Sequence, residues 1–213
     1  MAGRKLRFLI TEHPPAITSA RARHYDHIRQ VLEGLVGVPV HSQHYVDAKR
    51  LHDASAVVLS GSFAPWAVHD PAALRRFGRT VMGYAGPVLG ICAGMQLQVM
   101  FAGGAIGARE RPEVGFGPIE VIDHDDLLSG LGATAVTYKH HANDVIGLPD
   151  DFTVLARSAE CAVEAIGAAH RGWWGTQFHP ERFTARHPDG ARVLRNFFAL
   201  AGLASPSRPR AHG

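Results

Sequence analysis

Cys92 lies in a segment whose residue types favour nucleophilic chemistry. The segment reads Val88-Leu-Gly-Ile-Cys-Ala-Gly-Met-Gln96, and it predicts a buried strand that runs directly into a helix. Gly90 and Gly94 leave room for the sharp turn of a nucleophile elbow. The helix N-terminus would favour the thiolate, and the backbone N–H of Ala93 would face a developing oxyanion. A buried structural cysteine at a strand end is the competing interpretation.

A matching general base occurs in the segment Thr176-Gln-Phe-His-Pro-Glu181. His179 follows an apolar strand, and Glu181 is placed to accept a hydrogen bond from the second ring nitrogen. That contact would orient the imidazole and stabilise its charged form. A loop histidine beside a surface glutamate is the alternative, but the chain order with each residue at a strand end favours a catalytic triad of Cys92, His179 and Glu181.

The composition indicates one ordinary globular domain over residues 1–203. The chain has 213 residues, of which 46% are hydrophobic and 19% charged, and these values exclude a disordered or fibrous protein. The net charge is +3 with scattered basic residues, so we expect no nucleic-acid partner. The 14 histidines show no regular ligand spacing, so we expect no metal. Residues 204–213 are rich in Pro, Ser and Arg and are predicted to be disordered.

Two further features of the sequence bear on location. The two cysteines, Cys92 and Cys161, lie in apolar or glycine-rich settings that are typical of a reduced intracellular protein. No apolar run reaches the length of a membrane span, and the N-terminus does not match a signal peptide. We therefore expect a soluble cytoplasmic protein without a membrane partner.

The elements that must position these residues alternate between strands and helices in the first half of the chain. This alternation predicts an α/β fold with a doubly wound, mostly parallel sheet and helices on both faces. In the second half, short strands separated by turn signals predict added antiparallel strands. The predicted strands are 6–10, 38–41, 56–59, 87–91, 116–122, 134–138, 154–158, 162–168 and 172–178, and the predicted helices are 19–35, one opening at Pro71, one after Cys92, and 189–203.

Taken together, the two motifs resemble the class I (triad-type) glutamine amidotransferases, and most of all the glutaminase domains of GMP synthetases. Ser60-Gly61 after a strand resembles the oxyanion loop of that family, and the stretches 157–166 and 194–197 resemble its closing segments. The resemblance covers residues 6–200 and implies the flavodoxin-like fold of the family.

The resemblance also implies an activity and a set of roles. L-Glutamine would be hydrolysed through a glutamyl thioester on Cys92, without a cofactor, and the ammonia would pass to a separate synthase subunit. Ser62 and Ala93 fall where the family supplies the N–H groups of its oxyanion hole. The residues at substrate-binding positions of the family are Gly61, Gln96, His140, Ala142 and Asn143.

Two departures from the family pattern affect these expectations. The loop reads Ser60-Gly-Ser-Phe-Ala-Pro65, and Ser62 lacks the conformational freedom of glycine. One hypothesis is that a partner subunit must flip this loop into place. In the second departure, Ala142 and Asn143 stand where GMP synthetases carry Gly and Asp. A different acceptor partner and neutral drift explain this change equally well.

The sequence allows three functional classes to be compared, which are an amidotransferase subunit, a free-standing hydrolase and a non-catalytic domain. No glycine-rich phosphate loop with its lysine occurs in the sequence, so the acceptor chemistry of an amidotransferase would lie on another polypeptide. The acceptor stays open between GMP synthesis and a specialised metabolite. A free-standing γ-glutamyl hydrolase or peptidase is the alternative, which Gln96 and the His-Pro-Glu spacing disfavour. A non-catalytic binding domain is disfavoured because both Cys92 and His179 are present.

Overall fold

A mixed sheet runs through the residues that the computed structural model describes, 4–124 and 126–203. The strand order is β2-β1-β3-β4-β9-β8-β7-β5-β6. The parallel part consists of β2 (Val40–His44), β1 (Leu6–Ile10), β3 (Ala56–Leu59), β4 (Val88–Ile91) and β9 (Trp173–Thr176). The antiparallel part consists of β8 (Ala165–Ala168), β7 (Thr153–Arg157), β5 (Ala105–Val121) and β6 (Thr134–Gly147). The predicted parallel core with antiparallel additions is therefore confirmed.

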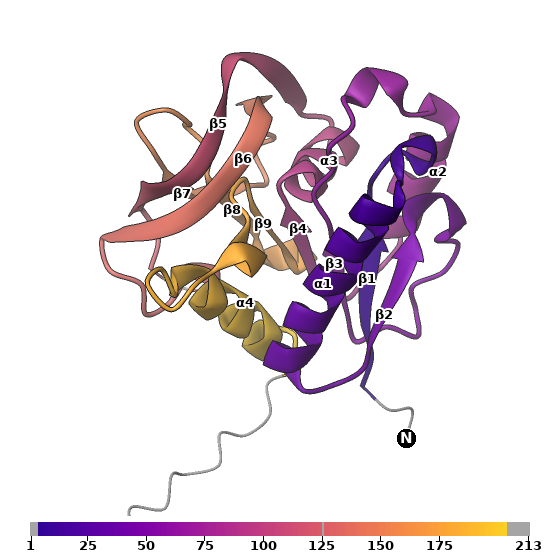
Figure 1. Cartoon of the computed structure of the whole chain (residues 1–213), viewed down its shortest axis with the longest axis horizontal. Helices are drawn as coiled ribbons and strands as arrows, with labels where there is room; N and C mark the ends of the chain where they lie inside the picture. The colour runs from indigo at the N-terminus through magenta and orange to yellow at the C-terminus, as the bar shows by residue number, and fades with distance from the viewer. Residues whose placement is uncertain (1–3, 125, 204–213) are drawn as a thin grey trace, which may run out of the picture.

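Helices cover both faces of this sheet, as the sequence pattern predicts. On one face, α1 (Ser19–Val36) and α4 (Asp189–Leu200) lie side by side (Figure 1) and share a core with Leu6 and Phe8 of β1. On the other face, α2 (Pro71–Met82) and α3 (Ala93–Phe101) pack on Leu9 and on β3. Alternation along β1 explains this division, because successive side chains of a strand point to opposite faces. Among the described residues, no helix combines the length and apolar character needed to cross a bilayer.

Local signals set the ends of the two longer helices of the first half. The Thr18 hydroxyl caps α1 by accepting a hydrogen bond from the Arg21 N–H, and Gly37 ends the helix in the left-handed conformation at φ 71°. Asp70 caps α2 in the same way, with Pro71 at the first helical position. These ends place the loops that follow β1 and β3 at the carboxyl edge of the parallel strands.

The antiparallel hairpin of β5 and β6 is much longer than the sequence indicates. We expect strands over 116–122 and 134–138, whereas pairing extends from residue 105 to 121 and from 134 to 147, with a register shift between Ala108 and Glu113. The added part carries charged and exposed side chains, so it lacks the apolar alternation that identifies a half-buried strand. The predicted tail at 204–213 lies outside the described residues.

Candidate active site

Cys92 occupies the junction between β4 and α3 in a backbone conformation that L-residues rarely adopt. Its dihedral angles are φ 51° and ψ −107°, and its N–H donates to the Thr176 carbonyl at 2.7 Å. A Cβ on Gly90 would lie 2.5 Å from the Met95 nitrogen, and one on Gly94 would lie 2.5 Å from the Leu59 oxygen. The strained elbow predicted from these glycines is therefore present, and strain of this kind is concentrated at functional sites.

His179 lies beside this cysteine, at the end of the neighbouring strand β9. Its Nδ1 is 2.8 Å from Oε1 of Glu181, so Nε2 is the ring nitrogen left to interact with Cys92. Burial lowers the pKa of the imidazole, but the charges of Glu181 and Cys92 outweigh it and hold that pKa well above its usual value. The arrangement thus stabilises a charged imidazole next to a thiol.

The loop after β3, which contains Gly61, packs against both His179 and Cys92. A Cβ on Gly61 would lie 3.0 Å from Cε1 of His179 and 3.7 Å from Cβ of Cys92. The glycine backbone therefore packs directly against both side chains, and only glycine leaves the imidazole where it is.

A cavity of about 250 Å³ opens over Cys92. Its wall contains every residue to which the sequence assigns a role, which are Gly61, Ser62, Cys92, Ala93, Gln96, His140, Ala142, Asn143, His179 and Glu181. These residues come from four separate parts of the chain. Three of the parts follow the neighbouring parallel strands β3, β4 and β9, and the fourth belongs to β6 of the antiparallel hairpin.

Gln96 is held by protein partners at both ends of its amide group. Its Oε1 accepts from the indole of Trp66 at 2.9 Å, and its Nε2 donates to the Asn143 carbonyl and to Gln177 Oε1, both at 3.1 Å. Gln177 in turn points its Nε2 at the sulfur of Cys92, 3.5 Å away. Gln96 therefore fixes the positions of neighbouring groups in the cavity wall. The sequence analysis did not identify Trp66 and Gln177 as partners of Gln96.

The segment from His140 to Asn143 belongs to β6 and forms another wall of the cavity. The His140 carbonyl oxygen is 3.7 Å from Sγ of Cys92, so this segment faces the nucleophile with its backbone. Burial, with the nearby charges of His179 and Arg182, lowers the pKa of the His140 imidazole. These effects favour the neutral form of the His140 ring.

Glu12 is a site residue that the sequence analysis missed. Its side chain is fully buried, and its carboxylate accepts hydrogen bonds from the N–H groups of His13, Phe63 and Ala64 and from the Ser62 hydroxyl. Burial raises the pKa of this carboxyl, but the hydrogen bonds outweigh it and lower the pKa overall. A usable signal did exist, because Glu12 follows β1 and the carboxyl ends of neighbouring parallel strands meet at one edge.

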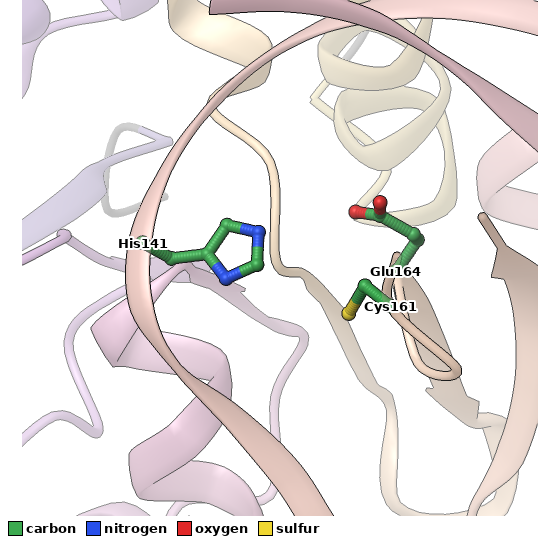
Figure 2. A group of neighbouring side chains, drawn as sticks. All are labelled: His141, Cys161 and Glu164. Carbon is green, nitrogen blue, oxygen red and sulfur yellow. The ribbon is translucent and has the colours of Figure 1, made fainter. Parts of the chain in front are cut away.

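A second group of titratable side chains lies under the β5–β6 hairpin. Figure 2 shows His141 reaching from its strand toward Cys161 and Glu164; all three are buried, and their ligand atoms lie within 4.8 Å of one another. These are residue types that bind zinc. However, the ammonium of Lys139 lies 2.6 Å from Glu164 Oε1 and 2.8 Å from Glu113 Oε1, and burial raises the pKa of the Cys161 thiol. The two ion pairs of Lys139 favour an ionic network that ties the hairpin to the segment just before β8.

Comparison with known protein families supports the interpretation of the motifs. The model of the family described as glutamine amidotransferase class-I matches residues 24–201. One of the subunits of glutamine-hydrolyzing GMP synthase from Pyrococcus furiosus is 41% identical over 116 residues, which are 54% of this chain and 61% of the relative. The corresponding subunit from Thermoplasma acidophilum is 31% identical over 155 residues, which are 73% of this chain and 76% of the relative. The match to the Pyrococcus relative thus spans less than two thirds of its length.

Solved structures show the same fold. A Thermoplasma acidophilum protein described as a GMP synthase subunit superposes with a TM-score of 0.77 at 27% identity, covering 92% of this chain and 94% of that chain. The glutaminase domain of Trypanosoma brucei CTPS with bound acivicin gives a TM-score of 0.68 at 15% identity, covering 97% of each chain. At that low identity, the second likeness concerns the fold alone.

Proposed function

Because the chain belongs to the class I glutamine amidotransferase family, we propose that it hydrolyses L-glutamine to glutamate and ammonia with Cys92 as the nucleophile. The observation that carries this proposal is the arrangement around Cys92. A strained cysteine at the start of α3 lies beside His179 and helps to raise the pKa of its imidazole, and His179 is paired with Glu181 at 2.8 Å beside a cavity.

The chemistry follows from these positions. Sγ of Cys92 forms a bond to the carboxamide carbon of glutamine, while His179 holds the proton that the thiol has given up. When the tetrahedral intermediate collapses, the carbon–nitrogen bond breaks and His179 transfers its proton to the leaving ammonia. The product is a glutamyl thioester on Cys92. Water then attacks the thioester with His179 as general base, and glutamate leaves as the thiol is restored.

Two backbone N–H groups are proposed to stabilise the oxyanion of each tetrahedral intermediate. Ala93 is the first residue of α3, so its N–H has no intrahelical partner and adds to the positive end of the helix. The Ser62 N–H donates to no group in the part of the chain that the structure describes. Donors fixed in advance stabilise charge where it develops, without reorganisation during the reaction.

The remaining candidate residues are proposed to hold the substrate. Gly61 and Ala142 leave backbone groups at the cavity wall, and His140 presents its carbonyl there. Gln96 fixes the position of the Asn143 carbonyl through its side-chain amide. Substrate glutamine would thus be gripped mainly by backbone groups, with Gln96 acting through Asn143.

We further propose that the ammonia is delivered to a separate synthase subunit. The relatives in Pyrococcus and Thermoplasma are named as single subunits of glutamine-hydrolyzing GMP synthases, and the sequence offers no phosphate loop for activating an acceptor. A GMP synthase-like partner therefore fits best, with the synthase of another metabolite as the alternative acceptor.

The proposal is tested by incubating the isolated chain with L-glutamine and measuring glutamate and ammonia. Equal amounts of both products are expected, and addition of the cognate synthase subunit should raise the rate. Cys92→Ala should abolish product release while the circular dichroism spectrum and melting temperature persist. Faster hydrolysis of γ-glutamyl conjugates than of free glutamine would instead identify a free-standing γ-glutamyl hydrolase.

A further inference from the structure

We infer that Glu12 is a positioning residue for the oxyanion hole. Its carboxylate holds the loop from Ser60 to Pro65 in a shape that turns the Ser62 N–H toward the cavity. We call the hydrogen bonds that hold this loop the lock, and all of them lie within this chain. This inference rests on the proposed chemistry at Cys92, and it assigns to Glu12 a role that the family motifs do not contain.

In the first half of the lock, the Glu12 carboxylate accepts hydrogen bonds from three consecutive residues of the loop. Glu12 Oε1 accepts from the Ser62 hydroxyl at 3.0 Å and from the Ala64 N–H at 3.1 Å, and Oε2 accepts from the Phe63 N–H at 2.9 Å. The His13 N–H adds a fourth bond at 2.9 Å, which fixes the carboxylate itself. Hydrogen bonds to an ionised acceptor are about twice as strong as neutral ones, and Glu12 is fully buried.

The second half of the lock acts on the peptide between Gly61 and Ser62. The Gly61 carbonyl oxygen is approached by the hydroxyls of Ser60 at 2.7 Å, Tyr25 at 3.2 Å and Thr11 at 3.3 Å. In a planar trans peptide the N–H points opposite to the C=O, and the described residues contain no cis peptide. The Ser62 N–H therefore points away from these hydroxyls, and both Gly61 and Ser62 line the cavity over Cys92.

Tyr25 joins the two halves. Its hydroxyl oxygen is 3.2 Å from Glu12 Oε2 and 3.2 Å from the Gly61 carbonyl oxygen, and its ring is almost fully buried. Turning the Gly61–Ser62 peptide over would break the carbonyl contacts and pull on the carboxylate at the same time. The loop is thus held by one connected set of hydrogen bonds from the segment after β1 and from α1.

The lock also accounts for the serine that departs from the family pattern. The Ser62 hydroxyl is itself one of the groups that Glu12 binds, so this side chain adds an anchor where a glycine would have none. The inference is thus the alternative to the hypothesis that a partner must flip the loop into place, because it holds the loop within the isolated chain.

The test compares Glu12→Gln with the wild-type chain in two reactions of Cys92. One is glutamine hydrolysis, and the other is hydrolysis of the chromogenic ester p-nitrophenyl acetate, which also passes through an oxyanion but needs no glutamine recognition. Loss of a single oxyanion donor costs about 10²- to 10³-fold in kcat. Because Glu12 acts through the loop, we expect kcat to fall about 10- to 100-fold in both reactions, with KM for glutamine changed by no more than about twofold.

Two controls separate positioning from a general loss of structure. Alkylation of Cys92 by iodoacetamide needs the thiolate but no oxyanion donor, so its rate should be the same in Glu12→Gln as in the wild type. Glu33→Gln, which removes an exposed carboxylate of α1 paired with Arg29, should leave both reactions unchanged. Glu12→Asp keeps the charge on a shorter side chain and should fall between Glu12→Gln and the wild type.

The outcomes distinguish this inference from the proposed function. An unchanged kcat in Glu12→Gln overturns the inference, and so does a parallel loss of kcat and alkylation rate with a lowered melting temperature. A wild-type chain that cleaves the ester but not glutamine would refute the proposed function alone. The effect of Glu12→Gln on ester cleavage would still decide the role of Glu12.

Discussion

Replacing Glu181 by Gln removes one charge from the proposed triad and little else. The amide has nearly the volume of the carboxylate, and its oxygen can still accept the Nδ1 hydrogen of His179. Glu181 is only 6% exposed, and its Oε1 lies 2.8 Å from Nδ1. The variant therefore keeps the tautomer of the imidazole while it removes the charge that stabilises the protonated ring.

The size of the effect follows from the strength of the bond that is weakened. A buried hydrogen bond to a charged partner contributes about 1.5–3 kcal/mol, and each 1.36 kcal/mol of barrier is a factor of about ten in rate. We therefore expect Glu181→Gln to lower kcat/KM for glutamine by roughly 10- to 150-fold. Glutamate release, measured with a coupled dehydrogenase, gives this ratio, and Glu33→Gln is the matched surface control.

The same variant should change the pH dependence of the reaction. Against the opposing effect of burial, Glu181 and Cys92 raise the pKa of His179, so removing the Glu181 charge should move the alkaline limb of the kcat/KM profile to lower pH. The raised pKa of His179 also affects stability. Protonated His179 contributes its full stabilisation at a pH below the pKa that it has in the unfolded chain, and this contribution is lost as the pH rises through its pKa in the folded chain. In Glu181→Gln this alkaline loss of stability should shrink.

Two results would refute this account of Glu181. One is a kcat/KM within about twofold of the wild type, with the alkaline limb at its original pH. The other is a large loss of activity that a lowered melting temperature explains completely, because the carboxylate would then support the fold alone.

Three further substitutions test separate parts of the structure. Gly61→Ala places a Cβ 3.0 Å from Cε1 of His179 and should reduce glutamine hydrolysis by about tenfold or more; unchanged kinetics would count against the loop's close approach. Gly90→Ala places a Cβ 2.5 Å from the Met95 nitrogen and should cost about 1–3 kcal/mol in urea unfolding, whereas an unchanged midpoint would contradict the tight elbow. Lys139→Met leaves two carboxylates without their cation and should cost about 3–5 kcal/mol; a loss below about 1 kcal/mol would show that the network is not ionic.

The elbow at Cys92 and the pairing of His179 with Glu181 could be predicted because their signals are local. The glycines around Cys92 and the two-residue spacing from His179 to Glu181 are visible in short segments, and each short segment determines its own turn. The positions of Ser62 and Asn143 in the same cavity follow only from the family resemblance, since nothing local links them to the cysteine.

The contacts of Glu12 with the loop from Ser60 to Pro65 could not be predicted in the same way. Glu12 and the loop are about 50 residues apart in the chain, and they meet because β1 and β3 are neighbours in the sheet. Trp66 and Gln177 were missed for the same reason, since their partner Gln96 lies on a third element. The extent of the long hairpin was missed because its exposed part is specified by pairing rather than by apolar periodicity.

The central claim is that Cys92 is the nucleophile that attacks glutamine, and covalent labelling tests it most directly. The isolated chain would be treated with a glutamine-mimicking diazoketone, digested and mapped by mass spectrometry, with and without excess glutamine. We predict one label per chain on Cys92, protection by glutamine, and no label on the buried Cys161. A label on Cys161, or full glutaminase activity in a chain whose Cys92 is completely labelled, would contradict the assignment.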